Sequence, residues 1–181
     1  MSVHKKTDTM NDAEKVLKGL LEGSERFRKA EAPAERERLA KGQSPKAAVL
    51  YCSDSREVVE TLLGCEKRGE IFGVRLPGNV ASSKVLGSLA FGVEHFHIPL
   101  IIVLGHTKCG AIAAAKSGAV AEDEDLQGLV SLVALDEKEN VRVQVQRILQ
   151  NRTVARLVAE GKVKVVGALH DMEKGTVKVL G

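Results

Sequence analysis

The sequence predicts an α/β fold: a mostly parallel central β-sheet flanked by helices, with an N-terminal helical arm and a C-terminal β-hairpin. Three observations predict it. Short runs rich in Val, Ile and Leu alternate with longer segments of helical periodicity, a pattern typical of parallel sheets covered on both faces. A charged amphipathic segment comes before the first of these runs. Two β-rich runs around a short turn come after the last helical segment.

We expect a single domain over residues 1–181, because a chain of 181 residues buries a sizeable core but rarely forms two domains. Residues 1–38 form the predicted arm and residues 39–181 the predicted core. Within the arm, a helix over residues 11–30 has Asn11 as its expected cap. Its apolar stripe consists of Ala13, Val16, Leu17, Leu20, Leu21 and Phe27. No neighbouring segment covers this stripe, so we expect it to pack on the body of the domain or on a second subunit.

Strands and helices alternate through the predicted core. The expected strands cover residues 47–51, 71–76 and 100–104. The expected helices cover residues 82–96, 110–116, 126–135 and 141–159. Two further strands, over residues 162–169 and 176–180, flank a turn at residues 173–175 and predict the closing hairpin.

Composition argues against nucleic-acid and membrane partners. Aromatic residues make up 3% of the chain, and the basic stretch over residues 26–41 is interleaved with glutamates, which indicates a solvated helix face. The longest apolar stretch, residues 98–104, contains Pro99 and is far shorter than the ~20 residues that cross a bilayer. The N-terminal residues contain no secretory signal, so we expect a soluble, cytoplasmic protein.

A first polar landmark follows the strand over residues 47–51, in the stretch AAVLYCSDSRE. Cys52, Asp54 and Arg56 each stand two positions from the last, where a buried strand reaches the edge of the sheet. In an extended chain this spacing sends all three side chains to one face. The chain has three cysteines and no export signal, which favours metal binding or catalysis over a disulfide framework.

A second landmark, IIVLGHTKCGAIAA over residues 101–114, places His106 and Cys109 after the most apolar strand. Two such strands that run the same way in one sheet bring Cys52, His106 and Cys109 together at its carboxyl edge. Two thiolates and one imidazole suit Zn²⁺ best, and three ligands leave a position for water or substrate. Cys65 as a fourth ligand would close the site. It lies in a polar segment without a partner spacing, so a partly buried small side chain is its expected role.

An open zinc site lowers the pKa of its water from near 15.7 to about 7. Two thiolates weaken zinc as a Lewis acid, so a neighbouring group must compensate. Asp54 can accept a hydrogen bond from the water, and Arg56 can keep that carboxylate ionised and oriented. Either landmark alone is usually structural. Both together, each directly after an apolar strand, indicate a metal site.

Two other interpretations of these residues stay open. The first is a domain with structural zinc, in which Cys65 completes the coordination. The second is a cysteine phosphatase in which Cys52 attacks and Arg56 binds phosphate. Such loops need more residues between the cysteine and the arginine and a glycine-rich cradle, and CSDSR offers neither.

At this point the sequence resembles the β-class carbonic anhydrases, zinc enzymes that interconvert carbon dioxide and bicarbonate. The resemblance covers about three quarters of the chain, from residue 39 onwards. The matching segments are LAKGQSPKAAVLYCSDSR, GEIFGVRLPGN, LIIVLGHTKCGAI, residues 139–141 and VGALHDMEKGTV. The resemblance implies a mostly parallel sheet with helices on both sides, assembled as homodimers or larger multiples, whose N-terminal helix reaches the partner subunit.

The resemblance also implies a reaction: reversible hydration of carbon dioxide to bicarbonate and a proton, by attack of zinc-bound hydroxide. It assigns zinc ligation to Cys52, His106 and Cys109, catalysis to Asp54 with Arg56, and substrate contact to Gln43, Phe72 and Phe91. Related proteins hydrolyse carbonyl sulfide or carbon disulfide, which makes these the alternative substrates at the same zinc site. In some family members the aspartate moves onto zinc and closes the site, and the sequence does not decide between the open and closed forms.

Several positions depart from the family pattern. Leu76 and Pro77 stand where many members have Asn-Ala or Asn-Val, which would narrow the pocket wall. Phe91 stands where plant-type members have a tyrosine. Glu57 replaces a usually apolar residue just after the dyad. Trp is absent, so the bicarbonate-triggered inhibitory site of some bacterial relatives cannot form in its usual way.

The remaining histidines give little indication of function. His95 and His97 are candidate proton relays, although histidines at helix ends are usually only solvated. His4 and His170 carry no functional signal in the sequence.

Overall fold

The computed structural model describes residues 7–65, 67–118 and 122–181. The chain divides into two compact units, one up to Gly42 and one over Gln43–Gly181. None of the helices that the structure describes is long and apolar enough to cross a membrane.

The first unit consists of two helices, α1 (Thr7–Ala30) and α2 (Pro33–Ala40). The predicted cap at Asn11 is wrong, because α1 begins four residues earlier and Asn11 lies inside it. The basic stretch is divided between two helices, since proline has no N–H and is tolerated only in a first turn. Arg36 of α2 donates to the carbonyls of Arg28 and Glu31, at 3.1 and 2.7 Å, and so satisfies carbonyl groups at the end of α1.

The apolar stripe of α1 is exposed. Its large side chains are more than half accessible to solvent: Val16, Leu17, Leu20, Leu21 and Phe27. Burying such a side chain is worth about 1.5–3 kcal/mol. The stripe therefore requires a covering surface that the first unit does not supply by itself.

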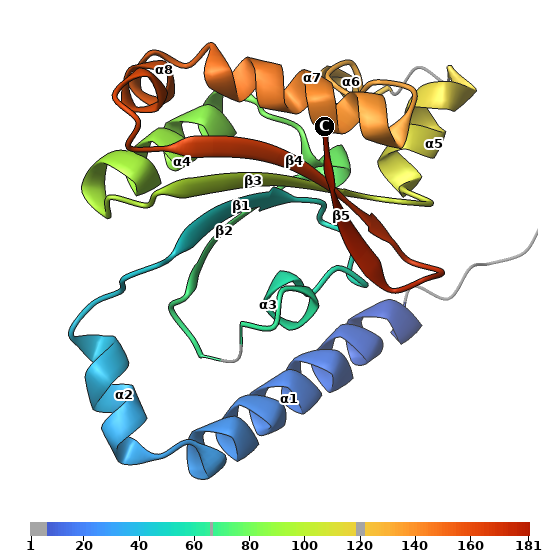
Figure 1. The fold of residues 1–181 in the computed structure, drawn as a ribbon. Helices are drawn as coiled ribbons and strands as arrows, with labels where there is room; N and C mark the ends of the chain where they lie inside the picture. Colours follow the sequence, from blue (N-terminus) through green and yellow to red (C-terminus); the bar gives the residue numbers. More distant parts are fainter. Residues whose placement is uncertain (1–6, 66, 119–121) are drawn as a thin grey trace, which may run out of the picture. The chain divides into compact units, whose positions relative to one another are not determined.

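The second unit is built on a five-stranded sheet. Its strands are β1 (Ala47–Tyr51), β2 (Ile71–Arg75), β3 (Leu100–His106), β4 (Lys164–Asp171) and β5 (Thr176–Leu180). They lie in the order β2-β1-β3-β4-β5 (Figure 1). The pairings among β1, β2, β3 and β4 are parallel, and β5 runs antiparallel to β4. The predicted fold class, with its mostly parallel sheet and closing hairpin, is confirmed.

The strand order reverses between β1 and β3, and this reversal positions the site. The chain passes from β1 outwards to β2, then returns past β1 to β3 and continues to β4. Accordingly α3 (Val59–Leu62) and α4 (Ser83–His95) lie on opposite faces of the sheet (Figure 1). At such a reversal a crevice forms at the carboxyl ends of the two central strands. The segments that follow β1 and β3 meet there.

The sheet has an apolar layer on each face because strand residues alternate between the faces. Ala48 and Leu50 of β1 pack in the layer under α4, α7 (Glu137–Leu149) and α8 (Arg152–Ala159). Val49 and Tyr51 pack in the opposite layer with Val59 of α3. Every residue of β1 is buried, which explains its unbroken apolar sequence.

Some predicted helix boundaries are wrong, and side-chain caps explain why. The helix expected over residues 126–135 is α6 (Glu124–Val130), which follows α5 (Gly110–Ser117) and begins behind an Asp123 cap. The long helix expected over residues 141–159 is two helices, α7 and α8. Asn151 accepts hydrogen bonds from the amides of Thr153 and Val154 and so starts α8 as a separate helix.

Helix α7 packs closely on the sheet through Val141, which lies over two glycines. A Cβ added at Gly105 of β3 would lie 2.5 Å from one methyl of Val141, and one at Gly167 of β4 would lie 2.6 Å from the other. The absence of a side chain at both positions allows α7 to approach β3 and β4.

We expect Gly167→Ala to destabilise the protein by about 1–3 kcal/mol, because the new methyl group overpacks the contact with Val141. Gly87→Ala in α4 is the matched control. Its Cβ would meet no atom within 4 Å, and replacing a helical glycine should stabilise by up to about 1 kcal/mol. Denaturant unfolding measures both, and equal midpoints for the two variants would contradict the packing argument.

Candidate metal centre

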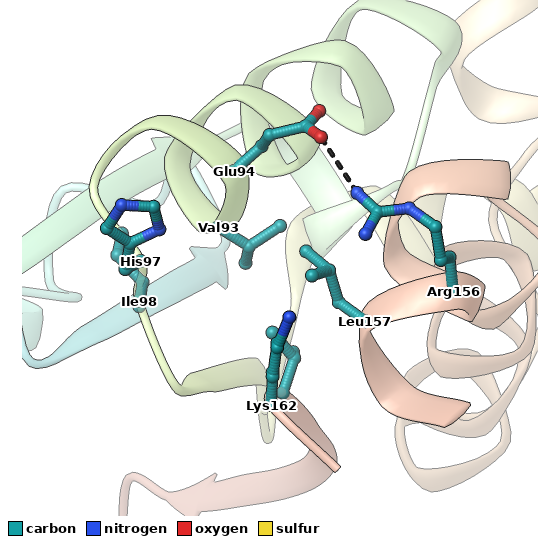
Figure 2. A pocket seen from close by; sticks show the side chains of 8 residues that line it. Val93, Glu94, His97, Ile98, Arg156, Leu157 and Lys162 are labelled. Atoms are coloured by element: carbon teal, nitrogen blue, oxygen red, sulfur yellow. Dashed lines mark hydrogen bonds and ion pairs between the residues drawn. The ribbon is translucent and has the colours of Figure 1, made fainter. Parts of the chain in front are cut away.

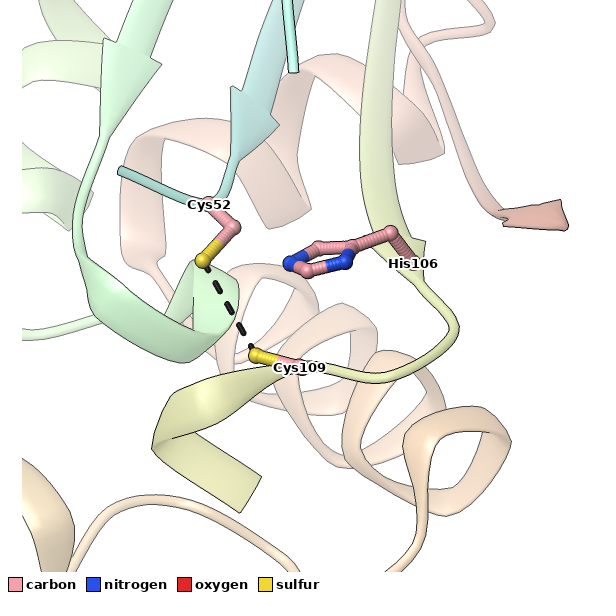
Figure 3. Close-up of side chains that lie close together, drawn as sticks. All are labelled: Cys52, His106 and Cys109. Atoms are coloured by element: carbon pink, nitrogen blue, oxygen red, sulfur yellow. Dashed lines mark hydrogen bonds between the residues drawn. The ribbon is translucent and has the colours of Figure 1, made fainter. Parts of the chain in front are cut away.

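Cys52, His106 and Cys109 converge as the sequence predicts. Their ligand atoms all lie within 4.8 Å of one another, and the two Sγ atoms are 3.9 Å apart. Figure 3 shows the imidazole of His106 directed towards the two sulfurs. All three side chains are buried. The cluster has two sulfurs and one nitrogen, the donor set that Zn²⁺ favours.

The pairing of β1 with β3 brings these residues together. Tyr51, the last residue of β1, pairs with Leu104, so Cys52 follows directly while His106 ends β3 two residues later. Lys108 adopts a positive φ of 57° and turns the chain back towards the sheet. Cys109 then stands at the N-cap of α5. A strand pairing and one tight turn therefore set the spacing of the three ligands.

The hydrogen bonds of His106 leave one nitrogen for a metal. Nδ1 lies 2.9 Å from the carbonyl oxygen of Thr107, which can only accept, so Nδ1 carries the proton. Nε2 is then a buried lone pair, and it has no hydrogen-bond partner among the described residues. A buried polar atom without a partner is costly, and a coordinated metal ion satisfies it.

Two neighbouring buried thiols share one negative charge. The pKa of Cys52 is lowered to about 4, chiefly because the Cys109 thiol donates to its sulfur, with a smaller contribution from the Gly78 amide. Its partner is affected in the opposite sense, since the Cys52 thiolate raises the pKa of Cys109. A divalent cation is what allows both sulfurs to be thiolates at once. The residues present therefore fit zinc.

The turn Pro77–Asn79 supports the sulfur of Cys52. The backbone N–H of Gly78 donates to Cys52 Sγ at 3.3 Å. Gly78 has φ 67°, and an added Cβ would lie 3.0 Å from Val133, so both conformation and space require glycine. Asn140 of α7 donates to the Gly78 carbonyl at 2.7 Å. A hydrogen-bonded path thus runs from α7 through the turn to the cysteine.

Asp54 and Arg56 form a close pair beside the cluster. Arg56 donates to the Asp54 carboxylate through Nε at 2.9 Å, Nη2 at 2.6 Å and its backbone N–H at 3.0 Å. These hydrogen bonds hold the pKa of Asp54 well below its usual range, so the carboxylate is ionised. Asp54 Oδ2 lies 4.0 Å from His106 Nε2.

The predicted reason for this arrangement, an extended chain from Cys52 to Arg56, is wrong. Ser55 and Arg56 form a turn in which the Glu57 N–H donates to the Asp54 carbonyl at 3.0 Å. The turn folds Arg56 back onto Asp54 and leaves its side chain half exposed. The alternation of side chains between the two faces therefore ends with the strand. Local hydrogen bonds position Asp54 and Arg56 instead.

Sequence analysis gave Arg75 no role, yet it orders the same segment from β2. Its guanidinium donates to the carbonyl of Cys52 at 3.2 Å from both Nε and Nη2, and to that of Asp54 at 2.9 Å. It also stacks over the Tyr51 ring at 4.7 Å. The position of Arg75 could have indicated this role, because the last residue of β2 pairs with the last residue of β1 in a parallel sheet.

His170, which carries no functional signal in the sequence, pairs with a buried carboxylate in the structure. Its Nδ1 lies 2.9 Å from Oε1 of Glu57, and both side chains are buried. The two residues are 113 positions apart, so no local pattern links them. In the sequence, Glu57 stands out only as a charged residue directly after Arg56.

Known proteins match this chain over most of its length. A sequence profile of the carbonic anhydrase family matches residues 47–135 and 125–177. Carbonic anhydrase 2 of Mycobacterium tuberculosis is 34% identical over 185 aligned positions, which cover 87% of this chain and 88% of that protein. The chain belongs to the carbonic anhydrase family.

Solved structures of carbonic anhydrases share the fold. A Coccomyxa β-carbonic anhydrase in complex with acetazolamide aligns with a TM-score of 0.78 and 25% identity, over 91% of this chain and 86% of that one. Tetrameric β-carbonic anhydrases of Sordaria macrospora align with a TM-score of 0.72 and 22% identity, over 94% of this chain and 98% of that one. The resemblance to the β class of carbonic anhydrases is confirmed.

The substrate contacts that this family resemblance implied lie away from the metal ligands. Gln43 is exposed and precedes β1, and Phe72 pairs with Ala48. At about 3.3 Å per strand residue, Phe72 is about 13 Å along the sheet from the level of Cys52. Phe91 is exposed on α4, 5.5 Å from the Phe96 ring that also lies near Phe72. One carbonic anhydrase chain does not bring these residues to its own cluster.

The candidate proton relays also lie at this distant edge. His95 stacks on Phe91 at 5.0 Å near the end of α4. His97 lines a cavity of about 470 Å³ between α4, α8 and the residues just before β4 (Figure 2). The charged groups of that cavity are paired, with Arg156 at 2.8 Å from Glu94. No residue that lines it belongs to the metal cluster.

Cys65 is a buried free cysteine, as expected, and it is not part of the cluster found among the described residues.

The zinc content of two cysteine variants tests which cysteines bind the metal. We expect Cys109→Ser to lose bound zinc, and Cys65→Ser to keep one zinc per chain, because only the former removes a ligand. Metal analysis of the purified variants measures it. Loss of zinc from Cys65→Ser would instead support a closed, structural site.

Proposed function

We propose that this carbonic anhydrase catalyses the reversible hydration of carbon dioxide to bicarbonate and a proton at zinc held by Cys52, His106 and Cys109. The observation that carries this proposal is the three-ligand cluster with an ionised carboxylate beside it, Asp54 Oδ2 being 4.0 Å from His106 Nε2. Three protein ligands are typical of catalytic zinc sites, whereas structural sites normally have four.

When bound, zinc supplies Lewis acidity that lowers the pKa of a coordinated water to about 7 and makes it a nucleophile at neutral pH. The residues of this chain orient the reaction. An ionised Asp54 only accepts hydrogen bonds, so it fixes the direction of the proton on the reacting water. Arg56 keeps Asp54 ionised, and Gly78 and Arg75 hold Cys52 in place.

We further propose that the resting site is the open form. Three hydrogen bonds from Arg56 hold the Asp54 carboxylate, two of them from the guanidinium to separate oxygens. Bidentate pairing of this kind is among the stronger charge-assisted contacts. Movement of Asp54 onto the metal would have to break it.

We propose that a second copy of the chain supplies the substrate contacts. Gln43, Phe72 and Phe91 lie at the amino side of the strands, whereas the ligands lie at the carboxyl edge. In a homodimer, the substrate contacts at the amino side of one copy can lie beside the metal ligands at the carboxyl edge of the other. The exposed stripe of α1, with Leu17, Leu20 and neighbouring residues, supports such assembly, because large apolar patches mark interaction surfaces.

We place the enzyme in the cytoplasm. The three cysteines are free, and buried free thiols persist in a reducing compartment. Carbonyl sulfide or carbon disulfide is the alternative substrate to carbon dioxide at the same ligands. Turnover of all three by one preparation distinguishes them.

We expect Asp54→Asn to lower kcat for carbon dioxide hydration by at least about 100-fold, because the variant amide can present a donor where the carboxylate only accepts. Zinc content should not change. Stopped-flow hydration assays measure the rate. Glu94→Gln is the matched control, since it removes the carboxylate of another exposed ion pair, 2.8 Å from Arg156, far from the cluster. A wild-type rate for Asp54→Asn would contradict the assigned role.

The proposed second copy predicts complementation between inactive variants. Gln43→Ala should lower kcat/KM by at least about tenfold, since it removes a hydrogen bond to substrate. Mixing it with Asp54→Asn should restore about a quarter of the wild-type rate, because half of randomly mixed dimers hold one complete site in two. No gain on mixing, with exchange of subunits verified, would show that Gln43 does not act across subunits.

A further inference from the structure

Glu57 is the only buried carboxylate among the described residues of this chain, with 1% of its surface exposed. A buried charge is tolerated only where a partner compensates it. That partner is His170, 2.9 Å away through Nδ1, itself 6% exposed. Neither residue is a metal ligand or a member of the dyad, so this pair has no role in the function proposed above.

The pair lies directly beside the catalytic residues. Glu57 follows Arg56 in sequence, and its N–H closes the turn by donating to the Asp54 carbonyl at 3.0 Å. On the other side, His170 of β4 pairs in register with His106 of β3. Residues paired in this way project their side chains to the same face of a parallel sheet. The carbonyl of His170 also accepts from the N–H of Thr107 at 2.9 Å.

The dyad turn is thus fastened to the sheet on two sides. Arg75 holds its beginning from β2 through the carbonyls of Cys52 and Asp54. Glu57 holds its end to β4 through His170. Arg56 itself reaches the body of the unit through a longer hydrogen bond, 3.3 Å from Nη2 to the Lys108 carbonyl, at an exposed position. An exposed contact of that length restrains a turn weakly.

We propose that the Glu57–His170 hydrogen bond is a positioning element for catalysis, which fixes the end of the Asp54–Arg56 turn to β4 and so holds the Asp54 carboxylate in its Arg56-paired orientation. The proposal rests on the role of Asp54 given under the proposed function. Glu57 acts through the backbone of the turn and does not touch the reacting atoms.

The directional character of the hydrogen bond between Glu57 and His170 distinguishes this positioning role from simple packing. A buried ion pair is often no more stabilising than an apolar pair of similar volume. A hydrogen bond has a preferred angle and length, whereas apolar contact is non-directional. Glu57→Leu keeps the volume and removes the acceptor, while Glu57→Gln keeps an acceptor oxygen for Nδ1–H of His170.

The first experiment measures the turn itself, by amide hydrogen exchange over residues 53–58 in the zinc-loaded protein. We expect Glu57→Leu to speed exchange there by about tenfold, and Glu57→Gln to stay within about threefold of wild type. Glu70→Leu is the matched control, because it removes one half of the Lys46–Glu70 pair, 3.0 Å apart at the opposite edge of the sheet. This measurement does not depend on turnover.

The second experiment separates positioning from stability. Glu57→Leu should lower kcat by about tenfold with KM within about twofold, and Glu57→Gln should restore most of kcat. In the cobalt-substituted protein, Glu57→Leu should change the visible spectrum, because a released Asp54 alters the surroundings of the metal. If Glu57→Leu does not fold, His170→Phe carries the same test, since it removes the donor and keeps a ring.

Some results would overturn the proposal. If Glu57→Leu shifts only the unfolding midpoint, with exchange, kcat and spectrum as in wild type, the pair is structural. If Glu57→Gln behaves as Glu57→Leu does, the charge and not the hydrogen bond matters. Absence of carbon dioxide turnover in the wild type would refute the proposed function, while the exchange and cobalt measurements would still decide the role of Glu57.

Discussion

The site depends on one constraint, the register in which β1 pairs with β3. Tyr51 opposite Leu104 places Cys52 and His106 at the same edge, one directly after its strand and the other at the end of its own. A slip of one residue would turn the side chains of a strand to the opposite face. The register is strongly specified, because both faces of β1 are buried in apolar layers. The packing of the core therefore fixes the geometry of the metal ligands.

In addition to the strand register, hydrogen bonds from distant elements restrict the conformation of the metal ligands. Asn140 and Gln144 on α7 share a hydrogen bond of 3.0 Å. Together they hold residues 78–81, since Asn140 donates to the carbonyl at the start of this segment and Gln144 accepts from the amide at its end. Arg75 binds the carbonyl of Cys52 from β2. A buried polar network of this kind is rigid when all its members are satisfied. The thiolate then does not have to be ordered when a metal ion binds.

The sequence predicted the fold class and the meeting of Cys52, His106 and Cys109, because apolar runs and the edge rule for parallel sheets are local or topological signals. It failed where the decisive contact was specific and distant. The start of α8 at Asn151 is a different failure, because asparagine is a favoured cap residue and its hydrogen bonds to Thr153 and Val154 are local. Glu57 and His170 are 113 positions apart, and no periodicity links a carboxylate after one strand to a histidine on another. Such contacts depend on packing that sequence patterns do not describe.

If a second copy supplies the substrate contacts, as proposed, assembly is linked to catalysis. The carboxyl edge holds the metal ligands, Asp54 and Arg56, but Phe72, one of the proposed substrate contacts, lies about 13 Å away along the strands. Under the proposed function, a single chain carries the residues that activate water, and a second copy supplies the residues that hold carbon dioxide beside it. The exposed stripe of α1 favours association, because four of its side chains, from Val16 to Leu21, are each more than half exposed. By mass action, the interactions that pair two chains then also set the fraction of complete active sites.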